Sequence, residues 1–329
     1  MIRTNFAVAI VIALAVGFSD ARAAVHPGSE AFVERAVSEF GLDADEVAAL
    51  LARAEYKQSI VDAMTRPAES KPWHEYRPIF LNERRIKEGI VFWRENRALV
   101  DSVSEQFGVD PQIIVSIIGV ETLYGRITGS YRVIDALATL GFYYPKELSR
   151  DRSEFFSTEL MHFIKLAQEE NLPLDQVTGS YAGAMGMGQF IPSSYRAYAV
   201  DFDGNGHRDL WRSTADVVGS VANYLHQHGW RPGDPVVNRA RPLPAAEPEL
   251  ASRRDFKPKL NVGQLAEKGY HGSADLDPER KAAVLKLDEG SHQSYWLTFD
   301  NFYVITRYNR SPLYAMAVLQ LSEAILEGM

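Results

Sequence analysis

The chain contains no cysteine among its 329 residues. This absence excludes disulfides, thiolate-bound zinc and a thiol that could carry a lipid anchor. Beyond the N-terminal segment, no apolar run is long enough to cross a bilayer as a helix. We therefore predict a protein that is held by its apolar core alone and has no stable membrane anchor.

Basic residues are scarce relative to acidic ones. Lysine and arginine total 35 and aspartate and glutamate total 43, which gives a formal net charge of −8 at pH 7. Such a balance offers little to neutralise phosphates or to hold an anionic membrane surface. Nucleic acid is therefore not an expected partner.

Residues 1–23 have the pattern of a secretory signal peptide. Arg3 provides a positive charge, residues 6–18 form a short apolar stretch, and Ala21-Arg22-Ala23 is a small-x-small cleavage signal. We expect cleavage after Ala23 and export of the remaining chain. The alternative is an uncleaved N-terminal anchor.

Most of the chain shows helical periodicity. Apolar residues recur at three- and four-residue spacing through 29–104, with a turn-rich break at 67–78. Asp110-Pro111 is a strong helix start, with Asp as N-cap and Pro at the first helical position. The helix that follows is apolar nearly all round and ends near Gly125, so we expect it to be buried. Further helices are predicted at 155–170, 215–227 and 312–326.

The character of the chain changes after Trp230. Six prolines from Pro232 to Pro258 exclude long regular structure in that stretch. Short alternating runs then predict strands of a small sheet at 283–287, 295–299 and 302–308. The expected fold class is mainly α, of the α+β kind.

One carboxylate stands in an unusually apolar stretch. Glu121 lies near the end of the apolar helix, with Ile118 and Val120 close by in sequence. Burial disfavours the ionised form, so we expect a raised pKa and a carboxyl group suited to general acid catalysis. The alternatives are an ion pair with Arg126 or a solvated side chain. We expect no other carboxylate in the chain to have such an apolar setting, so Glu121 is the predicted catalytic residue.

The segment 180–190 is rich in glycine and alanine. Glycine lets the backbone approach a ligand closely, and the side chains of Ser180 and Gln189 could hydrogen-bond a sugar. A phosphate-binding loop is not indicated, because no strand precedes the segment and no lysine follows it. A tight helix–helix contact is the alternative. A buried acid combined with such a small-residue loop is typical of a glycan-cleaving site.

The segment 201–209 begins like an EF-hand calcium loop. Oxygen-bearing side chains stand at loop positions 1, 3, 5 and 9; they are Asp201, Asp203, Asn205 and Asp209. Position 12 is Arg212 in place of the usual glutamate, and Asp216 could close the cage if the loop is longer. The alternative is a turn that holds no metal.

Several aromatic side chains could stack on sugar rings, and each could equally be a core residue. They are Trp73, Tyr76, Tyr143, Tyr144 and Trp230.

Four motifs, in order, resemble those of the membrane-bound lytic transglycosylase B family. They are Gly119-Val120-Glu121-Thr122-x-Tyr124-Gly125, the segment from Ser180 to Tyr195, the Asp201 loop with Ser220-Val221-Ala222-Asn223-Tyr224, and Arg307-Tyr308-Asn309-x-Ser311-x-Leu313-Tyr314-Ala315. The resemblance extends from about Ser29 to the C-terminus. It implies a lysozyme-like helical core with an N-terminal helical domain and a small inserted β-domain.

This resemblance divides the chain into five expected parts. They are a signal peptide at 1–23, an N-terminal helical domain at 24–104, a catalytic core with the EF-hand-like loop at 105–231, a proline-rich segment with the small β-domain at 232–300, and a C-terminal strand and helix returning to the core at 301–329.

The resemblance also implies a reaction. The family cleaves the β-1,4 bond between N-acetylmuramic acid and N-acetylglucosamine in peptidoglycan without water or a catalytic cofactor, and it leaves a 1,6-anhydromuramic end. Glu121 matches the catalytic residue, first as acid and then as base, and the lack of a second apolar carboxylate suits a one-carboxylate mechanism. The residues matching the glycan cleft are Ser180, Gln189, Tyr224, Tyr308, Asn309 and Tyr314. Those matching the cation loop are Asp201, Asp203, Asn205, His207 (by its carbonyl) and Asp216.

Three features depart from the family pattern. No cysteine is available for a lipid, so we expect a soluble periplasmic form. The basic stretch after Tyr144-Pro145 is interrupted, which leaves Arg150 and Arg152 as candidates for a substrate-binding arginine. The cation loop has one residue more before Asp216 than the family pattern, so the expected structural ion is either calcium or sodium.

Two other functions stay open at the level of sequence. A muramidase would use water and produce reducing ends. A non-catalytic, calcium-binding scaffold would bind peptidoglycan strands and recruit cell-wall synthases without cleaving the glycan.

Overall fold

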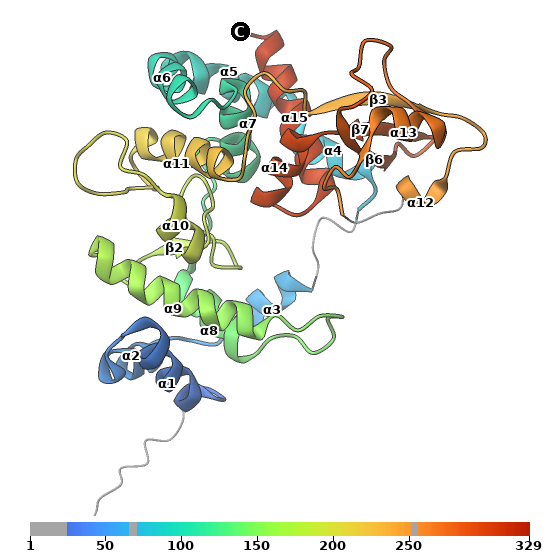
Figure 1. Ribbon diagram of the computed structural model, residues 1–329. Coiled ribbons are helices and arrows are strands. Elements are labelled where there is room, and N and C mark those ends of the chain that lie inside the picture. Colours follow the sequence, from blue (N-terminus) through green and yellow to red (C-terminus); the bar gives the residue numbers. More distant parts are fainter. Residues whose placement is uncertain (1–24, 66–70, 252–254) are drawn as a thin grey trace, which may run out of the picture.

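The computed structural model describes residues 25–65, 71–251 and 255–329 (Figure 1). The predicted signal peptide at 1–23 lies outside the described residues. Among those that are described, no helix is long and apolar enough to cross a membrane. Helices dominate, and a five-stranded antiparallel sheet forms a smaller unit late in the chain. The predicted mainly α class with a small β-unit is therefore confirmed.

Six helices precede the buried helix within the described ranges. They are α1 (Ser29–Phe40), α2 (Ala44–Leu51), α3 (Gln58–Met64), α4 (Trp73–Phe80), α5 (Glu83–Glu95) and α6 (Arg97–Phe107). Gly41 ends α1 in the left-handed conformation, with φ 62°. Asp43 and Asn82 cap α2 and α5, because each side chain accepts a backbone N–H of the first turn.

Helix α4 corrects one prediction. The sequence indicates a turn-rich break at 67–78, whereas α4 occupies much of that stretch. Trp73 and Tyr76 lie on α4 and are both buried in the main core. Their packing outweighs the poor helix propensity of Pro78, which lies within the helix.

The central part of the chain contains five helices and a short two-stranded ladder, within the described residues. They are α7 (Pro111–Thr122), α8 (Val133–Phe142), α9 (Ser153–Glu170), α10 (Pro192–Tyr198) and α11 (Thr214–Gln227), with β1 (Tyr131–Arg132) paired to β2 (Thr178–Gly179). Helix α7 is buried on nearly every side, as predicted. Pro111 is its first residue, although the Asp110 side chain makes no capping hydrogen bond.

The sheet has the strand order β4-β6-β7-β3-β5, and every pair is antiparallel. Its elements are β3 (Val237–Pro242), β4 (Leu260–Asn261), β5 (Tyr270–His271), β6 (Lys281–Asp288) and β7 (Gln293–Thr298), with helices α12 (Pro248–Ala251) and α13 (Val262–Glu267). The predicted strands at 283–287 and 295–299 are confirmed. A core of its own, separate from the main one, includes Leu265, Tyr270 and Leu297.

Two helices end the chain, α14 (Asp300–Tyr308) and α15 (Pro312–Glu327). The strand predicted at 302–308 is therefore wrong. Its short apolar run is ambiguous by periodicity, and as a helix it buries Phe302, Val304 and Ile305 together. Helix α15 packs against α7, α4, α5 and α14, which returns the C-terminus to the main core (Figure 1).

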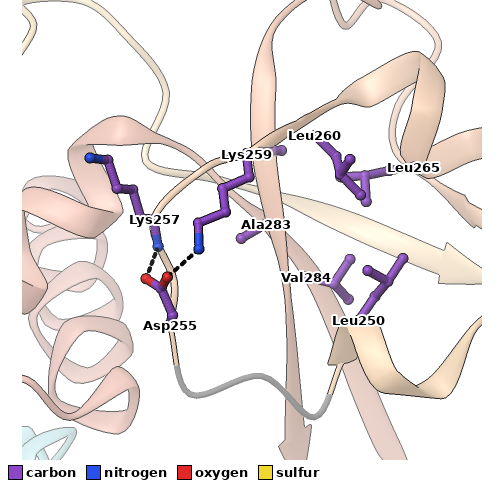
Figure 2. A pocket seen from close by; sticks show the side chains of 9 residues that line it. Leu250, Asp255, Lys257, Lys259, Leu260, Leu265, Ala283 and Val284 are labelled. Atoms are coloured by element: carbon purple, nitrogen blue, oxygen red, sulfur yellow. Dashed lines mark hydrogen bonds and ion pairs between the residues drawn. The ribbon is translucent and has the colours of Figure 1, made fainter.

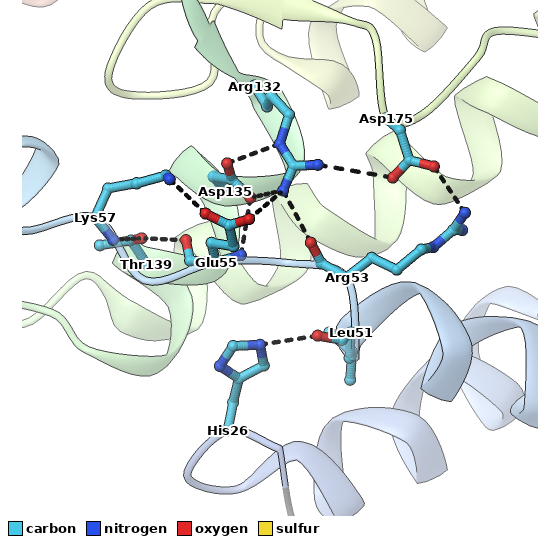
Figure 3. Close-up of polar contacts among 9 residues, drawn as sticks. All are labelled: His26, Leu51, Arg53, Glu55, Lys57, Arg132, Asp135, Thr139 and Asp175. Carbon is cyan, nitrogen blue, oxygen red and sulfur yellow. Dashed lines mark hydrogen bonds and ion pairs between the residues drawn. The ribbon is translucent and has the colours of Figure 1, made fainter.

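The segment after α2 is tied to α8 by polar contacts (Figure 3). Asp135, which is buried on α8, accepts the Glu55 backbone N–H at 2.8 Å and two bonds from the Arg132 guanidinium. One turn further along α8, the Thr139 hydroxyl accepts the Lys57 N–H at 3.1 Å. These bonds satisfy backbone N–H groups in the irregular segment between α2 and α3, and they fix the N-terminal helices to the central ones.

Candidate active site

The predicted acid lies at the very end of α7. Glu121 is the penultimate helical residue and is partly buried. Leu123 and Tyr124 follow in the left-handed conformation, with φ 50° and 58°, so the chain turns sharply away from the helix. The carboxyl group thus projects from a rigid, buried element at a point where the backbone leaves it.

A tyrosine of the last helix meets this carboxyl group. The Tyr314 hydroxyl donates a hydrogen bond to Glu121 Oε1 at 2.6 Å. Tyr314 is 2% exposed, and its burial, followed by the charge of Glu121, raises the pKa of its hydroxyl well above the usual range. The hydroxyl therefore stays protonated and acts as a donor. Arg126, the ion-pair partner considered from sequence, contacts Glu88 at 2.8 Å.

Two further tyrosines form a wall beside the site. The Tyr308 hydroxyl donates to the Gly188 carbonyl at 2.5 Å, and burial together with Glu121 raises its pKa well above the ordinary value. The Tyr224 ring lies edge-on to Tyr308 at 4.8 Å, and burial raises the pKa of Tyr224 to about 12. Asn309, next to Tyr308, accepts the Ser311 N–H at 3.0 Å through its side chain. The raised pKa values keep the hydroxyl groups of this wall neutral.

The glycine-rich segment forms a compact loop opposite α7. The Ser180 hydroxyl accepts the backbone N–H groups of Ala182 and Ala184 at 3.3 and 3.0 Å. Gln189 has φ 51°, and its side-chain amide donates to the carbonyls of Gly186 and Thr128 at 2.9 and 3.1 Å. A Cβ on Gly188 would lie 3.2 Å from the Tyr308 hydroxyl, so a side chain there would press on Tyr308.

Glu121 therefore lies where the end of α7 meets α15, and the bond from Tyr308 to Gly188 joins α14 to the loop. The structure places Tyr314 in direct contact with Glu121, and the charge of Glu121 contributes to the raised pKa of Tyr308. Gln189 and Tyr224 are connected to Tyr308 through the loop and the tyrosine wall. Ser180 shapes the same loop.

Two other groups of predicted site residues lie elsewhere. Tyr76 is 1% exposed and packs against Trp73 and Phe80, so it has no free face for a sugar and that expectation is corrected. Arg150 and Arg152 are exposed on the connection before α9 and at its start. The Arg152 guanidinium lies 4.6 Å from the centre of the Phe155 ring.

The acidic loop after α10 gathers three carboxylates. Oxygen atoms of Asp201, Asp203 and Asp216 all lie within 4.8 Å of one another. Calcium–oxygen distances of roughly 2.3–2.6 Å place opposite ligands about 5 Å apart, so this donor set fits a hard cation. Asp216 is fully buried, and its oxygens accept the N–H groups of Phe202 and Asp209, both at 2.8 Å. The geometry favours Asp216 as the residue that closes the loop.

The remaining predicted ligands point differently. The Asn205 side-chain oxygen accepts the His207 N–H at 2.9 Å, and His207 itself is exposed. The Asp209 carboxylate accepts N–H groups of the turn that follows, from Trp211 at 2.9 Å and Arg212 at 3.0 Å.

The structure also holds a buried glutamate that sequence reasoning missed. Glu159 on α9 is 4% exposed and accepts the Ser193 N–H at 2.9 Å and the Ser193 hydroxyl at 2.6 Å. Its burial raises its pKa despite these two bonds. The expectation that no other carboxylate has such apolar surroundings is therefore wrong. Leucine and phenylalanine at helical spacing on both sides of Glu159 were the available signal.

A small hollow in the sheet unit contains none of the predicted site residues (Figure 2). Leu250, Leu260, Leu265 and Val284 line it, and at its rim the Lys259 ammonium donates to Asp255 at 2.6 Å.

Comparison with known proteins identifies relatives over nearly the full chain. Membrane-bound lytic murein transglycosylase B of Escherichia coli (strain K12) is 41% identical over 310 residues, which is 91% of this chain and 83% of that protein. The solved structure of soluble lytic transglycosylase SltB1 from Pseudomonas aeruginosa is 44% identical, with a TM-score of 0.83, and the match covers 92% of this chain and 99% of that one.

Two similar structures contain ligands. An Escherichia coli lytic transglycosylase in complex with calcium is 41% identical, with a TM-score of 0.81 over 92% of this chain and 94% of that chain. Pseudomonas aeruginosa SltB3 in complex with NAG-anhNAM-pentapeptide is 32% identical, with a TM-score of 0.76 over 91% of this chain and 78% of that chain. Residues 24–323 match the family model described as the transglycosylase SLT domain. The chain belongs to this transglycosylase family.

Proposed function

We propose that this protein is a peptidoglycan lytic transglycosylase. It cleaves the β-1,4 bond between N-acetylmuramic acid and N-acetylglucosamine and leaves a 1,6-anhydro-N-acetylmuramic end. The observation that carries the proposal is the Glu121 carboxyl group, held at the end of a buried helix by the Tyr314 hydroxyl and flanked by Tyr308. The names of the relatives and the anhydro-sugar ligand of one similar structure support it.

Glu121 acts twice in this proposal. As an acid, it gives its proton to the glycosidic oxygen while the bond from that oxygen to C1 of the muramic sugar breaks. As a base, the resulting carboxylate takes the proton of the C6 hydroxyl, whose oxygen attacks C1 and closes the anhydro ring. The substrate's own N-acetyl group stabilises the cation that develops between the two steps. No second carboxylate is needed, unlike in two-carboxylate glycosidases.

The tyrosines and the loop serve this chemistry by position. Tyr314 donates to Oε1 and so orients the carboxyl group that exchanges the proton. We assign the glycan cleft to residues on the loop and the tyrosine wall, namely Ser180, Gln189, Tyr224, Tyr308 and Asn309. Arg150 and Arg152 are proposed as outer contacts to the substrate.

The acidic loop is proposed to hold a structural calcium or sodium ion. Asp201, Asp203 and Asp216 would bind it through their carboxylates, with Asn205 and the His207 carbonyl completing the set. The calcium complex of the similar Escherichia coli structure supports this assignment. Such an ion would offset the mutual repulsion of three acids and stabilise the connection before α11; it takes no part in the reaction.

The signal-like residues 1–23 support export, and we propose a periplasmic enzyme that acts on peptidoglycan strands and meets cell-wall synthases there. We also propose that the chain divides into domains at 24–104, 105–231, 232–300 and 301–329. The last part consists of the two helices α14 and α15.

Mass spectrometry of the products tests the function directly. Purified peptidoglycan is incubated with the mature protein, and the soluble muropeptides are analysed. Anhydro ends, one water lighter than reducing ends, are expected. Reducing ends would establish a muramidase instead, and glycan binding without any product would establish the scaffold.

A further inference from the structure

Thr122 follows Glu121 directly, and its side chain is 1% exposed. The Thr122 hydroxyl oxygen lies 2.8 Å from the Met187 carbonyl oxygen and accepts the Gly125 N–H at 3.0 Å. It also lies 3.2 Å from the Ile118 carbonyl, one turn back in α7. A hydroxyl has only one proton to donate, so we assign the hydrogen bond to the closer acceptor, the Met187 carbonyl. One side chain therefore joins the helix end, the turn after it and the glycine-rich loop.

The loop is also held from its other side. The Met187 N–H donates to the Leu210 carbonyl at 2.8 Å, so both polar groups of this residue are bonded. The next carbonyl, that of Gly188, accepts the Tyr308 hydroxyl. Segment 187–189 is thus fixed between the catalytic helix and the tyrosine wall, and the Thr122 hydroxyl bonds α7 directly to this segment.

The turn after α7 packs closely on the same segment. A Cβ on Gly125 would lie 2.9 Å from the Met187 sulfur. Leu123 and Tyr124 hold left-handed backbone conformations that non-glycine residues adopt at an energetic cost. By accepting the Gly125 N–H, the Thr122 hydroxyl stabilises this turn as well as the loop.

We propose that Thr122 is a positioning residue for glycan cleavage. Its hydroxyl sets the distance between the Glu121 carboxyl group and loop segment 187–189, so that Gln189 and Tyr308 hold a sugar in register with the acid. This inference rests on the proposed function and adds a residue to it. A purely structural role in the core is the competing explanation.

Two substitutions separate these explanations. Thr122→Val keeps the shape and removes the hydroxyl, which leaves the Met187 carbonyl and the Gly125 N–H without this partner; Thr122→Ser keeps the hydroxyl. The matched control is Thr139→Val, because Thr139 is also a buried threonine whose hydroxyl bonds a neighbouring segment, far from the loop in sequence.

Hydrogen exchange measured by mass spectrometry on the mature protein reports the loop without any substrate. We expect faster exchange of peptides covering 185–190 in Thr122→Val and wild-type exchange there in Thr122→Ser and Thr139→Val. Turnover of peptidoglycan by Thr122→Val should fall about 10- to 100-fold in kcat, the scale of a misplacement near 1 Å, with KM changed less than about threefold. Thr122→Ser should restore most of the turnover.

Unchanged exchange at 185–190 in Thr122→Val would overturn the proposal, and so would faster exchange with wild-type kcat. An equal loss of kcat in Thr139→Val would assign the effect to general stability. The wild-type products are analysed first, so a failure to form anhydro ends contradicts the proposed function, while the exchange data judge the contact of Thr122 with the loop separately.

Discussion

Two regions of the molecule, the end of α7 and the loop at 201–216, surround their carboxylates with different hydrogen-bond donors. Glu121 meets the hydroxyl of a buried tyrosine, which can donate to either protonation state. Asp201 accepts three backbone N–H groups, and these bonds, led by that of Gly206, lower its pKa. Backbone donors thus fix the loop acid as an anion, suited to an ion. The hydroxyl setting of Glu121 leaves room for a proton to move, as a catalytic acid requires.

The sharpest way to test this contrast is Glu121→Gln. The amide cannot exchange a proton, so we expect kcat to fall by about 10³-fold or more, within the range of general acid–base catalysis. The melting temperature should stay near that of the wild type, because the shape is kept. Muropeptide release followed by chromatography gives the rate. Glu159→Gln is the matched control, a second buried glutamate outside the site, and it should retain turnover. Retained turnover in Glu121→Gln would remove Glu121 from the mechanism.

The next largest effect is expected for Tyr314→Phe. Losing a hydrogen bond to an ionisable carboxyl group costs about 1.5–3 kcal/mol, which corresponds to a loss of roughly 10- to 100-fold in kcat. Because the Tyr314 pKa is raised far above neutrality, the wild-type hydroxyl should give no limb of its own in a pH–rate profile up to pH 9. Tyr270→Phe removes a comparable buried hydroxyl in the sheet unit, where it donates to the Glu247 carbonyl, and should leave kcat unchanged. Equal kcat in both variants would contradict the role of Tyr314.

The cation loop should affect stability and leave the chemistry intact. Asp216→Asn forces an amide NH₂ towards one of two backbone N–H donors, so we expect the free energy of unfolding to fall by about 1–3 kcal/mol. If calcium occupies the loop, excess chelator should lower the melting temperature of the wild type by several degrees while anhydro products still form. The chelator should have no effect on Asp201→Asn. A melting curve that chelator leaves unchanged would contradict calcium occupancy.

Sequence patterns predicted the regions that obey a single local rule. The continuous apolar run of α7 and the short, largely alternating runs of β6 and β7 each form the expected element. The errors occur where two rules compete. Residues 302–308 are apolar at both strand and helix spacing, and α4 contains a proline yet is held by buried aromatic rings.

The candidate site divides in the same way. Glu121 was predictable because its apolar neighbours are adjacent in sequence, and the carboxylates of the cation loop because their spacing is local. Contacts across the chain were not predictable by such rules. The partner of Glu121 lies 193 residues away on α15, and the bond of Thr122 spans 65 residues. The burial of Tyr76 likewise depends on helices that only the folded chain brings together.

The smallest expected effect is on the pH dependence of stability in a Glu159 variant. It tests whether this buried carboxyl group is held as an anion, like Asp201, or can take up a proton, as proposed for Glu121. Burial raises its pKa above the ordinary value of 4.5, although two bonds from Ser193 favour the anion. A group whose pKa is raised in the folded state contributes its full stabilisation at pH values below its unfolded-state pKa. This stabilisation is lost as the pH rises through the folded-state pKa. The melting temperature of Glu159→Gln should therefore gain on that of the wild type between pH 4 and pH 8. Substitution of the exposed Glu30 by glutamine should give a constant difference. If the Glu159→Gln difference is also constant, then the Ser193 bonds offset the burial, and Glu159 belongs with the fixed anions of the cation loop.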